Sequence, residues 1–167
     1  DSLNGGGGAD TLLGGDGGDR IDGAAGADHQ FGGLDADTLL GGGDDDILSG
    51  GAGADSLNGG GGVDAVSYLF SDEFELASGP VTVVLSNPAL NLGDAAGDII
   101  NFSVEQVLGT VHGDFLQGNS SATFLSGHDG VDTLLGAFGD DTLAGGGGAD
   151  SLNGGDGFDV ASYQFGT

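Results

Sequence analysis

Residues 5–67 read GGGGADTLL, GGDGGDRID, GAAGADHQF, GGLDADTLL, GGGDDDILS, GGAGADSLN and GGGGVDAVS, seven consecutive nonapeptides without an insertion. The sixth position is Asp in every copy: Asp10, Asp19, Asp28, Asp37, Asp46, Asp55 and Asp64. The eighth position is aliphatic in all copies but one: Leu12, Ile21, Leu39, Leu48, Leu57 and Val66, with Gln30 as the exception. A short motif repeated at a fixed period indicates a repeat architecture such as a solenoid.

A second array begins at Gly109 and reads GTVHGDFLQ, GNSSATFLS, GHDGVDTLL, GAFGDDTLA, GGGGADSLN and GGDGFDVAS. Its sixth positions are Asp114, Thr123, Asp132, Asp141, Asp150 and Asp159. The segment GADSLNGG at Gly53 recurs at Gly148, 95 residues later. This second, longer period is typical of a slice of a protein built from larger repeated units.

The composition shift between the arrays suggests a division into three parts: a repeat array at 1–67, an irregular solenoid segment or connecting insert at 68–108, and a second repeat array at 109–167. The middle part holds both prolines and the strand-like run VTVVL at 81–85. GDAAGDIIN, from Gly93, is a further nonapeptide with Asp98 and Ile100 in the sixth and eighth places. We expect irregular turns of the same solenoid here, with an excursion near residues 70–80, rather than a separate subdomain.

Each nonapeptide is expected to divide into a six-residue turn and a three-residue strand. Glycines allow tight turns and positive φ, and the middle residue of the strand triplet faces inward. If one nonapeptide makes half a coil, residues 18 apart stack, and strands pair in parallel on two faces. The inward columns are then Leu12, Leu48 and Val66 on one face, and Ile21, Leu39 and Leu57 on the other. The sequence therefore predicts an all-β chain, folded as a parallel β-roll (β-solenoid) with two nonapeptides per coil.

A core one aliphatic side chain thick cannot offset the ordering entropy of a chain with 40 glycines in 167 residues. The stacked Asp residues suggest what else stabilises the fold. Carboxylates about 4.8 Å apart repel one another unless cations lie between them. Ca²⁺ accepts six to eight oxygen ligands from carboxylates and carbonyls, whereas Mg²⁺ requires a tighter octahedron and retains its waters. We therefore expect calcium in the Gly/Asp turns.

The motif GGxGxDxUx, where U is aliphatic, resembles the calcium-binding nonapeptide of RTX (repeats-in-toxin, hemolysin-type) proteins. The resemblance covers both arrays. It implies that each ion lies between the GGxGxD loops of neighbouring coils, bound by the sixth-position Asp and by backbone carbonyls of positions one to four. It also implies about nine Ca²⁺ ions, secretion by a one-step (type I) route from a bacterium, and folding outside the cell or at its surface.

Carried onto this chain, the resemblance gives two sets of calcium ligands. The carboxylate ligands are Asp1, Asp10, Asp19, Asp28, Asp37, Asp46, Asp55, Asp64, Asp114, Asp132, Asp141, Asp150 and Asp159. The ligands at positions one and three of the repeats are Gly5, Gly7, Gly14, Asp16, Gly23, Ala25, Gly32, Leu34, Gly41, Gly43, Gly50, Ala52, Gly127, Asp129, Gly136 and Phe138.

Several residues depart from the motif. Asp35 and Asp44 replace the fourth-position glycine, which either adds a carboxylate to a site or spoils the turn. Gln30 either occupies the core position or marks a bulge that turns Phe31 inward. We expect the side chains of the remaining acids to be solvated in turns: Asp16, Asp22, Asp45, Asp129, Asp140 and Asp156. We also expect Leu13, Phe31, Leu40 and Leu135, which face outward, to be ordinary exposed residues rather than a contact patch.

The charge excludes some partners. With 27 acidic residues against one basic residue, and a net charge of −26, no basic patch exists for nucleic acid or an anionic membrane surface. No apolar run is long enough to span a bilayer, no signal peptide is recognisable, and there is no Cys for a disulfide. The chain has no P-loop and no recognisable nucleophile motif, so we expect that it is not an enzyme.

Two function classes fit best: a calcium-dependent structural module of a larger secreted protein, or a repeat unit of an adhesin, surface-layer or filament protein. An ice-binding solenoid would need regular outward Thr rows, but the seventh positions on one face are Thr11, His29, Ile47 and Ala65. Residues 1–4 read as the end of a preceding copy. We therefore expect the first coil to be covered by neighbouring repeats or by end-to-end association with another chain.

Overall fold

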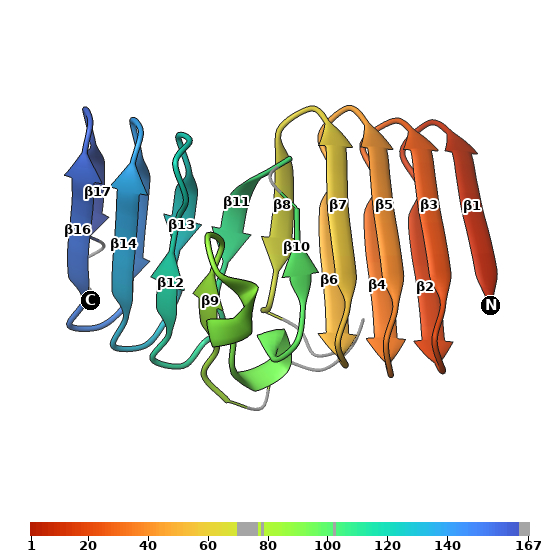
Figure 1. Ribbon diagram of the computed structural model, residues 1–167, viewed down its shortest axis with the longest axis horizontal. Coiled ribbons are helices and arrows are strands. Elements are labelled where there is room, and N and C mark those ends of the chain that lie inside the picture. Colours follow the sequence, from red (N-terminus) through yellow and green to blue (C-terminus); the bar gives the residue numbers. More distant parts are fainter. Residues whose placement is uncertain (70–76, 78, 102, 164–167) are drawn as a thin grey trace.

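The computed structural model describes residues 1–69, 77, 79–101 and 103–163. Strands stack side by side along one long axis, from β1 at one end to β16 and β17 at the other (Figure 1). In the first half the strands are β1 (Ser2–Gly7), β2 (Thr11–Asp16), β3 (Arg20–Ala25), β4 (His29–Leu34), β5 (Thr38–Gly43), β6 (Ile47–Ala52), β7 (Ser56–Gly61) and β8 (Asp64–Ser67). They are followed by β9 (Thr82–Val84), β10 (Ile99–Ile100), β11 (Val104–Leu108), β12 (Phe115–Gln117), β13 (Phe124–Ser126), β14 (Thr133–Phe138), β15 (Thr142–Gly146), β16 (Ser151–Asp156) and β17 (Val160–Tyr163).

The strands form two faces. One face, here the continuous face, is an eight-stranded sheet in the order β17-β15-β13-β11-β8-β6-β4-β2. The opposite face, here the split face, consists of a sheet β1-β3-β5-β7-β10 and a sheet β16-β14-β12-β9. Pairing is parallel, and residues 18 apart are partners within the arrays, as in Leu3 with Ile21 and Leu39 with Leu57. The predicted parallel β-solenoid with two nonapeptides per coil is confirmed.

The predicted division of the nonapeptide is wrong in one respect. The regular strands are six residues long and include positions seven to nine of one repeat and one to three of the next, as in β2 and β5. The turn is therefore only positions four to six. The strand continues because the position-two and position-three residues still pair with the next coil, as Gly6 does with Ala24 and Gly7 with Ala25.

Positive φ angles recur at positions two and four of the repeat, which explains the glycines at those two positions. Asp35 and Asp44, at position four, both adopt φ of 72°, so these two residues retain the turn geometry. Ala24 (φ 76°) and Ala137 (φ 85°) take the same left-handed region at position two, where an L-residue with a Cβ is strained.

Within the arrays the core consists of eighth-position side chains, one column from each face, and the middle segment adds further buried side chains. Ile21, Leu39, Leu48, Leu57 and Val66 are all fully buried, as the sequence predicts. Leu12 is half-buried. Burying one apolar side chain per strand gives each coil only a few kcal/mol of stabilisation, so the core is as thin as expected.

Gln30 occupies its core position without a bulge. It pairs in register with Leu12 and Leu48, and 1% of its surface is exposed. Its Nε2 donates a hydrogen bond to the Leu40 carbonyl at 2.6 Å, while its Oε1 is buried without a partner. The alternative in which Phe31 turns inward is therefore wrong.

The middle segment contributes strands to both faces. β10 pairs with β7 and β11 pairs with β8, so the nonapeptide that contains Asp98 and Ile100 stacks on the first array. β9 pairs with β12 of the second array, and the 3₁₀ helices η1 (Pro88–Leu90) and η2 (Gly93–Ala95) lie between β9 and β10 in sequence. The predicted excursion near residues 70–80 lies mostly outside the described residues.

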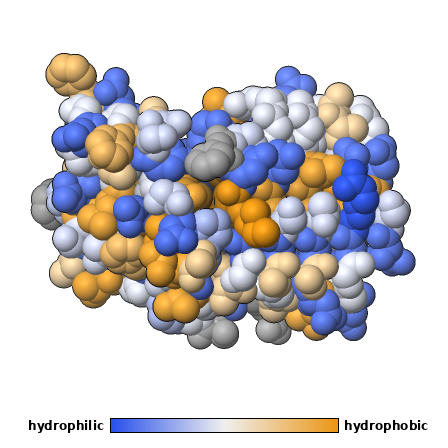
Figure 2. Space-filling view, viewed as in Figure 1, coloured by the Kyte–Doolittle hydropathy of each residue, from blue (hydrophilic) through white to orange (hydrophobic). Residues whose placement is uncertain are grey.

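Apolar and polar residues are interspersed on the face shown in Figure 2. Leu13 is 41% exposed, whereas Phe31, Leu40 and Leu135 are half-buried. The middle segment adds further exposed apolar side chains at Leu90, Leu92 and Ile99.

Candidate metal centre

Sixth-position Asp residues form a column along each edge of the solenoid, at the turn that precedes each strand. The continuous-face column begins with Asp10, Asp28, Asp46 and Asp64. The split-face column consists of Asp1, Asp19, Asp37, Asp55 and Asp98, followed beyond the gap between β10 and β9 by Asp114, Asp132 and Asp150. Both stacking orders in the first array agree with those predicted from the sequence.

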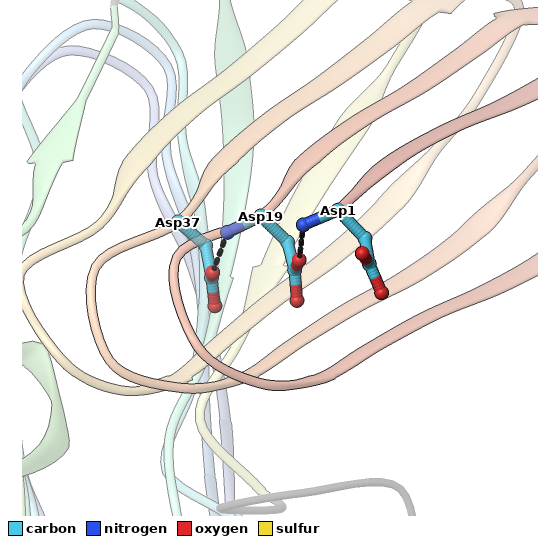
Figure 3. A network of polar contacts seen from close by, with 3 residues as sticks. All are labelled: Asp1, Asp19 and Asp37. Carbon is cyan, nitrogen blue, oxygen red and sulfur yellow. Dashed lines mark hydrogen bonds and ion pairs between the residues drawn. The ribbon is translucent and has the colours of Figure 1, made fainter.

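From the second coil on, one carboxylate oxygen of the column Asp residues accepts a hydrogen bond from the preceding coil. The backbone N–H of Asp19 donates to Asp37 Oδ1 at 2.7 Å, and that of Asp28 donates to Asp46 Oδ1 at 2.8 Å. The same bond, one coil on each time, recurs through both columns. At the start of the split-face column the N-terminal ammonium of Asp1 donates to Asp19 Oδ1. Figure 3 shows three carboxylates of this column stacked in the same orientation.

The second carboxylate oxygen has no partner in most of these residues. Oδ2 is buried without any hydrogen bond in Asp10, Asp19, Asp28, Asp37, Asp46, Asp55, Asp64, Asp132, Asp141 and Asp150. A buried carboxylate oxygen without a donor is strongly unfavourable unless a cation or a proton meets it. The orphan oxygens therefore fit a hard cation that accepts oxygen ligands, as Ca²⁺ does.

Backbone oxygens converge on the same places. A Cβ added to Gly32 would lie 2.3 Å from Asp37 Oδ2 and 2.5 Å from the Gly50 carbonyl oxygen. At Gly41 the corresponding distances are 2.4 Å to both Asp46 Oδ2 and the Gly59 carbonyl oxygen. The first-position glycine thus leaves open a space lined by a carboxylate oxygen and a carbonyl oxygen. This geometry fits the predicted role of the position-one carbonyls, because Ca²⁺ binds both kinds of oxygen.

The position-three carbonyls also hold the turns together. Gly8 N–H donates to the Ala25 carbonyl at 2.8 Å, and Gly26 N–H donates to the Gly43 carbonyl at 3.2 Å. These oxygens retain a second lone pair. The assignment of Ala25 and Gly43 as calcium ligands stays a prediction. The same is true of the other position-three residues: Gly7, Asp16, Leu34, Ala52, Asp129 and Phe138.

No side chain of opposite charge neutralises the columns. Arg20, the one Lys or Arg of the chain, pairs with Asp22 at 3.7 Å on the outer surface. Burial, opposed in part by backbone hydrogen bonds and reinforced by neighbouring carboxylates, raises the pKa of Asp46 and Asp132 to about 6. The same causes raise the pKa of Asp55 to about 7. The folded chain therefore holds carboxylates that favour either a proton or a cation near neutral pH.

Glu105 acts as a member of the continuous-face column that the sequence analysis missed. Its Oε2 accepts a hydrogen bond from the Asp64 backbone N–H at 3.0 Å, the bond made elsewhere by a sixth-position Asp. The ladder shifts register between Val104 and Gln106, which accommodates the longer side chain. The sequence does contain a signal for Glu105, which stands two residues before the buried Val107. The same offset separates each sixth-position Asp from the eighth-position aliphatic residue of its repeat.

Two acids expected to be solvated make bonds between coils. Asp45 Oδ1 accepts from Val63 N–H at 2.8 Å, and Asp140 Oδ1 accepts from Phe158 N–H at 2.9 Å. Both stand at position five, next to the sixth-position Asp, and both bond the fifth-position amide of the next coil. Both side chains are exposed in turns, as expected, but each also bonds a turn amide because a short Asp side chain can reach it.

Three buried sixth-position residues have no orphan oxygen. Asp98 Oδ2 accepts from the Tyr68 hydroxyl at 2.7 Å, and Asp114 Oδ2 accepts from Thr110 N–H at 2.6 Å. Thr123 uses its N–H to bond Asp141 Oδ1 at 2.8 Å, and its hydroxyl donates to the Ser121 carbonyl. These residues preserve the stacking of coils without offering an unpartnered oxygen.

Within the part of the chain that the structure describes, no three His, Asp or Glu side chains gather around one point. A cation at the columns would therefore take backbone carbonyls as well as carboxylates as ligands. A pocket of about 260 Å³ lies elsewhere and is lined by Ser126, His128 and Asp129 among others. His128 Nε2 is buried and makes no hydrogen bond among the described residues.

Comparison with known families gives one match. The model of the RTX calcium-binding nonapeptide repeat matches four stretches, at residues 1–29, 31–66, 108–143 and 126–161, which together cover well over half of the chain. No match was found among curated proteins. Among the residues that the structure describes, no helix is long and apolar enough to cross a membrane.

Proposed function

Because the chain belongs to the RTX calcium-binding nonapeptide repeat family, we propose that it is a calcium-binding structural module of a larger secreted bacterial protein, folding outside the cell as Ca²⁺ binds. The observation that carries the proposal is the column of buried carboxylates whose Oδ2 atoms have no partner. In this role the chain supplies a scaffold and no catalytic group. About nine ions would bind, between the turns of neighbouring coils.

Coupled folding follows from the charge. At a net charge of −26 and without a cation, repulsion between stacked carboxylates opposes the compact state. Calcium binds the folded chain because only the folded chain brings the carboxylate and carbonyl oxygens together, so its binding free energy becomes folding free energy.

The test is circular dichroism of the chain in EDTA and then in millimolar CaCl₂. We expect a cooperative gain of β signal on adding calcium, and a much smaller gain with the same concentration of MgCl₂. Full β structure in EDTA at neutral pH would rule out coupled folding.

Variants locate the ions. Asp46→Ala removes a carboxylate with a buried orphan oxygen, whereas Thr123→Ala removes a hydroxyl that is already bonded to Ser121. Asp46→Ala should raise the calcium concentration at the folding midpoint more than Thr123→Ala does. Equal shifts would mean that the ions do not bind at the sixth position.

One observation favours a second function, as a repeat unit of an adhesin, surface-layer or filament protein. Residues 148–163 repeat residues 53–68 with four differences in 16 positions, the sign of a longer repeat of 95 residues. Larger repeated units of this kind stack their neighbours end to end, within one chain or between chains. Light scattering of the calcium-bound chain against concentration tests this, because a strictly monomeric species would exclude self-association.

A further inference from the structure

The interior junction between the two arrays carries a carboxylate unlike the others. Asp98 is fully buried, and its Oδ1 accepts from the Asp55 backbone N–H at 2.9 Å, as in every regular coil. Its Oδ2, however, accepts from the Tyr68 hydroxyl at 2.7 Å. In ten other column members the equivalent oxygen is buried with no donor at all.

Tyr68 is held in place to make this bond. It directly follows β8, its ring belongs to the core, and 2% of its surface is exposed. Its backbone N–H donates to the Leu108 carbonyl at 2.8 Å, which fixes it against β11. Burial and the Asp98 carboxylate raise the pKa of the hydroxyl well above its ordinary value, so the hydroxyl keeps its proton and donates.

The first carboxylate beyond the gap is satisfied in the same manner. Asp114 Oδ1 accepts from the Val81 N–H at 2.8 Å, the usual bond between coils. Its Oδ2 accepts from the Thr110 N–H at 2.6 Å and from the Thr110 hydroxyl at 3.2 Å. Asp98 and Asp114 therefore border the break between β10 and β9 on the split face, and both have all their oxygens occupied by protein donors.

We infer that the Tyr68 hydroxyl takes the place of a cation at Asp98, and Thr110 does so at Asp114, so that the junction closes without calcium and separates two blocks of calcium sites. The inference rests on the proposed function, since it assumes that the unpartnered Oδ2 atoms are the ones that bind ions. A protein donor satisfies a buried carboxylate oxygen as an ion does, but it is present before any ion arrives.

Calcium stoichiometry measured by isothermal titration calorimetry tests the inference with a matched pair, Asp98→Asn and Asp46→Asn. Asn retains an oxygen for the amide of the preceding coil in both variants. We expect Asp98→Asn to bind as many ions as the natural chain, and Asp46→Asn to bind at least one fewer.

The outcomes separate the inference from the proposed function. Loss of an ion from both variants would overturn the inference and leave the calcium assignment standing. No loss from Asp46→Asn would overturn the calcium assignment itself, and the inference with it.

A second pair tests the tyrosine directly, because the repeated segment supplies its own control. Tyr68→Phe removes the donor to Asp98, whereas Tyr163→Phe changes the equivalent residue of the second copy, which is half exposed. We expect Tyr68→Phe to raise the calcium concentration at the folding midpoint by at least twofold, and Tyr163→Phe to leave it unchanged. Equal midpoints for the two variants would overturn the role of Tyr68.

Discussion

In the coils around Asp37 and Asp46, each carboxylate gives one oxygen to a neighbouring amide and leaves the other buried and unpartnered. At the junction, Asp98 and Asp114 stand in the same place and make the same bond between coils, but side-chain and backbone donors fill the second oxygen. The stacking of coils and the demand for a cation are thus separable properties of one residue. The Oδ1 atom makes the bond between coils, which the regular coils and the junction share. The Oδ2 atom creates the demand for a cation, and that demand depends on whether a protein donor lies beside it.

The largest effect should come from filling the space that a regular coil leaves open. Gly32→Ala would place a Cβ 2.3 Å from Asp37 Oδ2 and 2.5 Å from the Gly50 carbonyl oxygen. We expect it to cost about 3 kcal/mol of folding free energy in saturating calcium, measured by denaturant unfolding. Gly61→Ala is the control, because no atom lies within 4 Å of its added Cβ. A loss of equal size at Gly61 would show that glycine matters only for backbone freedom.

The next effect concerns pH in the absence of calcium. Burial raises the pKa of Asp46 to about 6 and of Asp55 to about 7 in the folded chain, above the ordinary carboxyl value. Protons therefore stabilise the fold: the contribution is fully present below about pH 4 and is lost as the pH rises through 6 to 7. In EDTA, the β signal in circular dichroism should increase as the pH is lowered from 8 to about 5.

The matched variants for this experiment each remove one charge. Asp55→Asn should reduce the pH dependence because the buried site no longer titrates, whereas Asp156→Asn changes an exposed carboxylate. If both variants retain the full dependence, general charge repulsion rather than the buried column controls the acid response.

A smaller effect is expected at Gln30, which breaks the apolar core column as Thr123 breaks the carboxylate column. Its Oε1 is buried without a donor, so Gln30→Leu should stabilise the calcium-bound chain by about 1 kcal/mol. Leu48→Gln, in the next coil of the same column, should destabilise it by about 2–3 kcal/mol. Thermal unfolding of both variants in saturating calcium measures the difference, and a destabilised Gln30→Leu would show that the bond to Leu40 is essential.

The smallest effect concerns backbone strain. Ala24 has φ of 76°, so Ala24→Gly should stabilise the chain by about 0.5–1 kcal/mol. The adjacent Ala25 pairs with Gly7 and Gly43 in an ordinary strand conformation, so Ala25→Gly should destabilise by about 0.5 kcal/mol. Opposite signs in chemical denaturation are the expected result, and equal signs would contradict the strain at Ala24.

The sequence predicts those structural features that recur with the period of the repeat. Once Asp37 and Leu39 are placed, translation by 18 residues places every equivalent residue, which is why the solenoid, the core column and the Asp columns are confirmed. Tyr68 and Thr110 could not be recognised in this way, because their bonds to Asp98 and Asp114 follow no period. Glu105 lies between these cases: its offset from Val107 follows the repeat, but its longer side chain hides the likeness.

The strand length was mispredicted for a different reason. Glycine-rich stretches ordinarily indicate turns, yet Gly41–Gly43 belong to β5 because neighbouring coils supply backbone partners on both sides. Local propensity is overridden where a long-range ladder satisfies every amide. Only a three-residue turn then remains, and that turn carries the Asp.

The bonds between coils also give the molecule a direction. In each of the regular Asp pairs the backbone amide donates to the carboxylate of the coil that follows it along the axis, and the reverse bond does not occur among these pairs. The column therefore has a direction, because all the carboxylate acceptors face one way along the axis and all the amide donors face the other. Two such solenoids stacked head to tail would continue the pattern, whereas two stacked head to head would bring carboxylate against carboxylate. Any fibre built by extending these columns would accordingly be polar, with two chemically different ends.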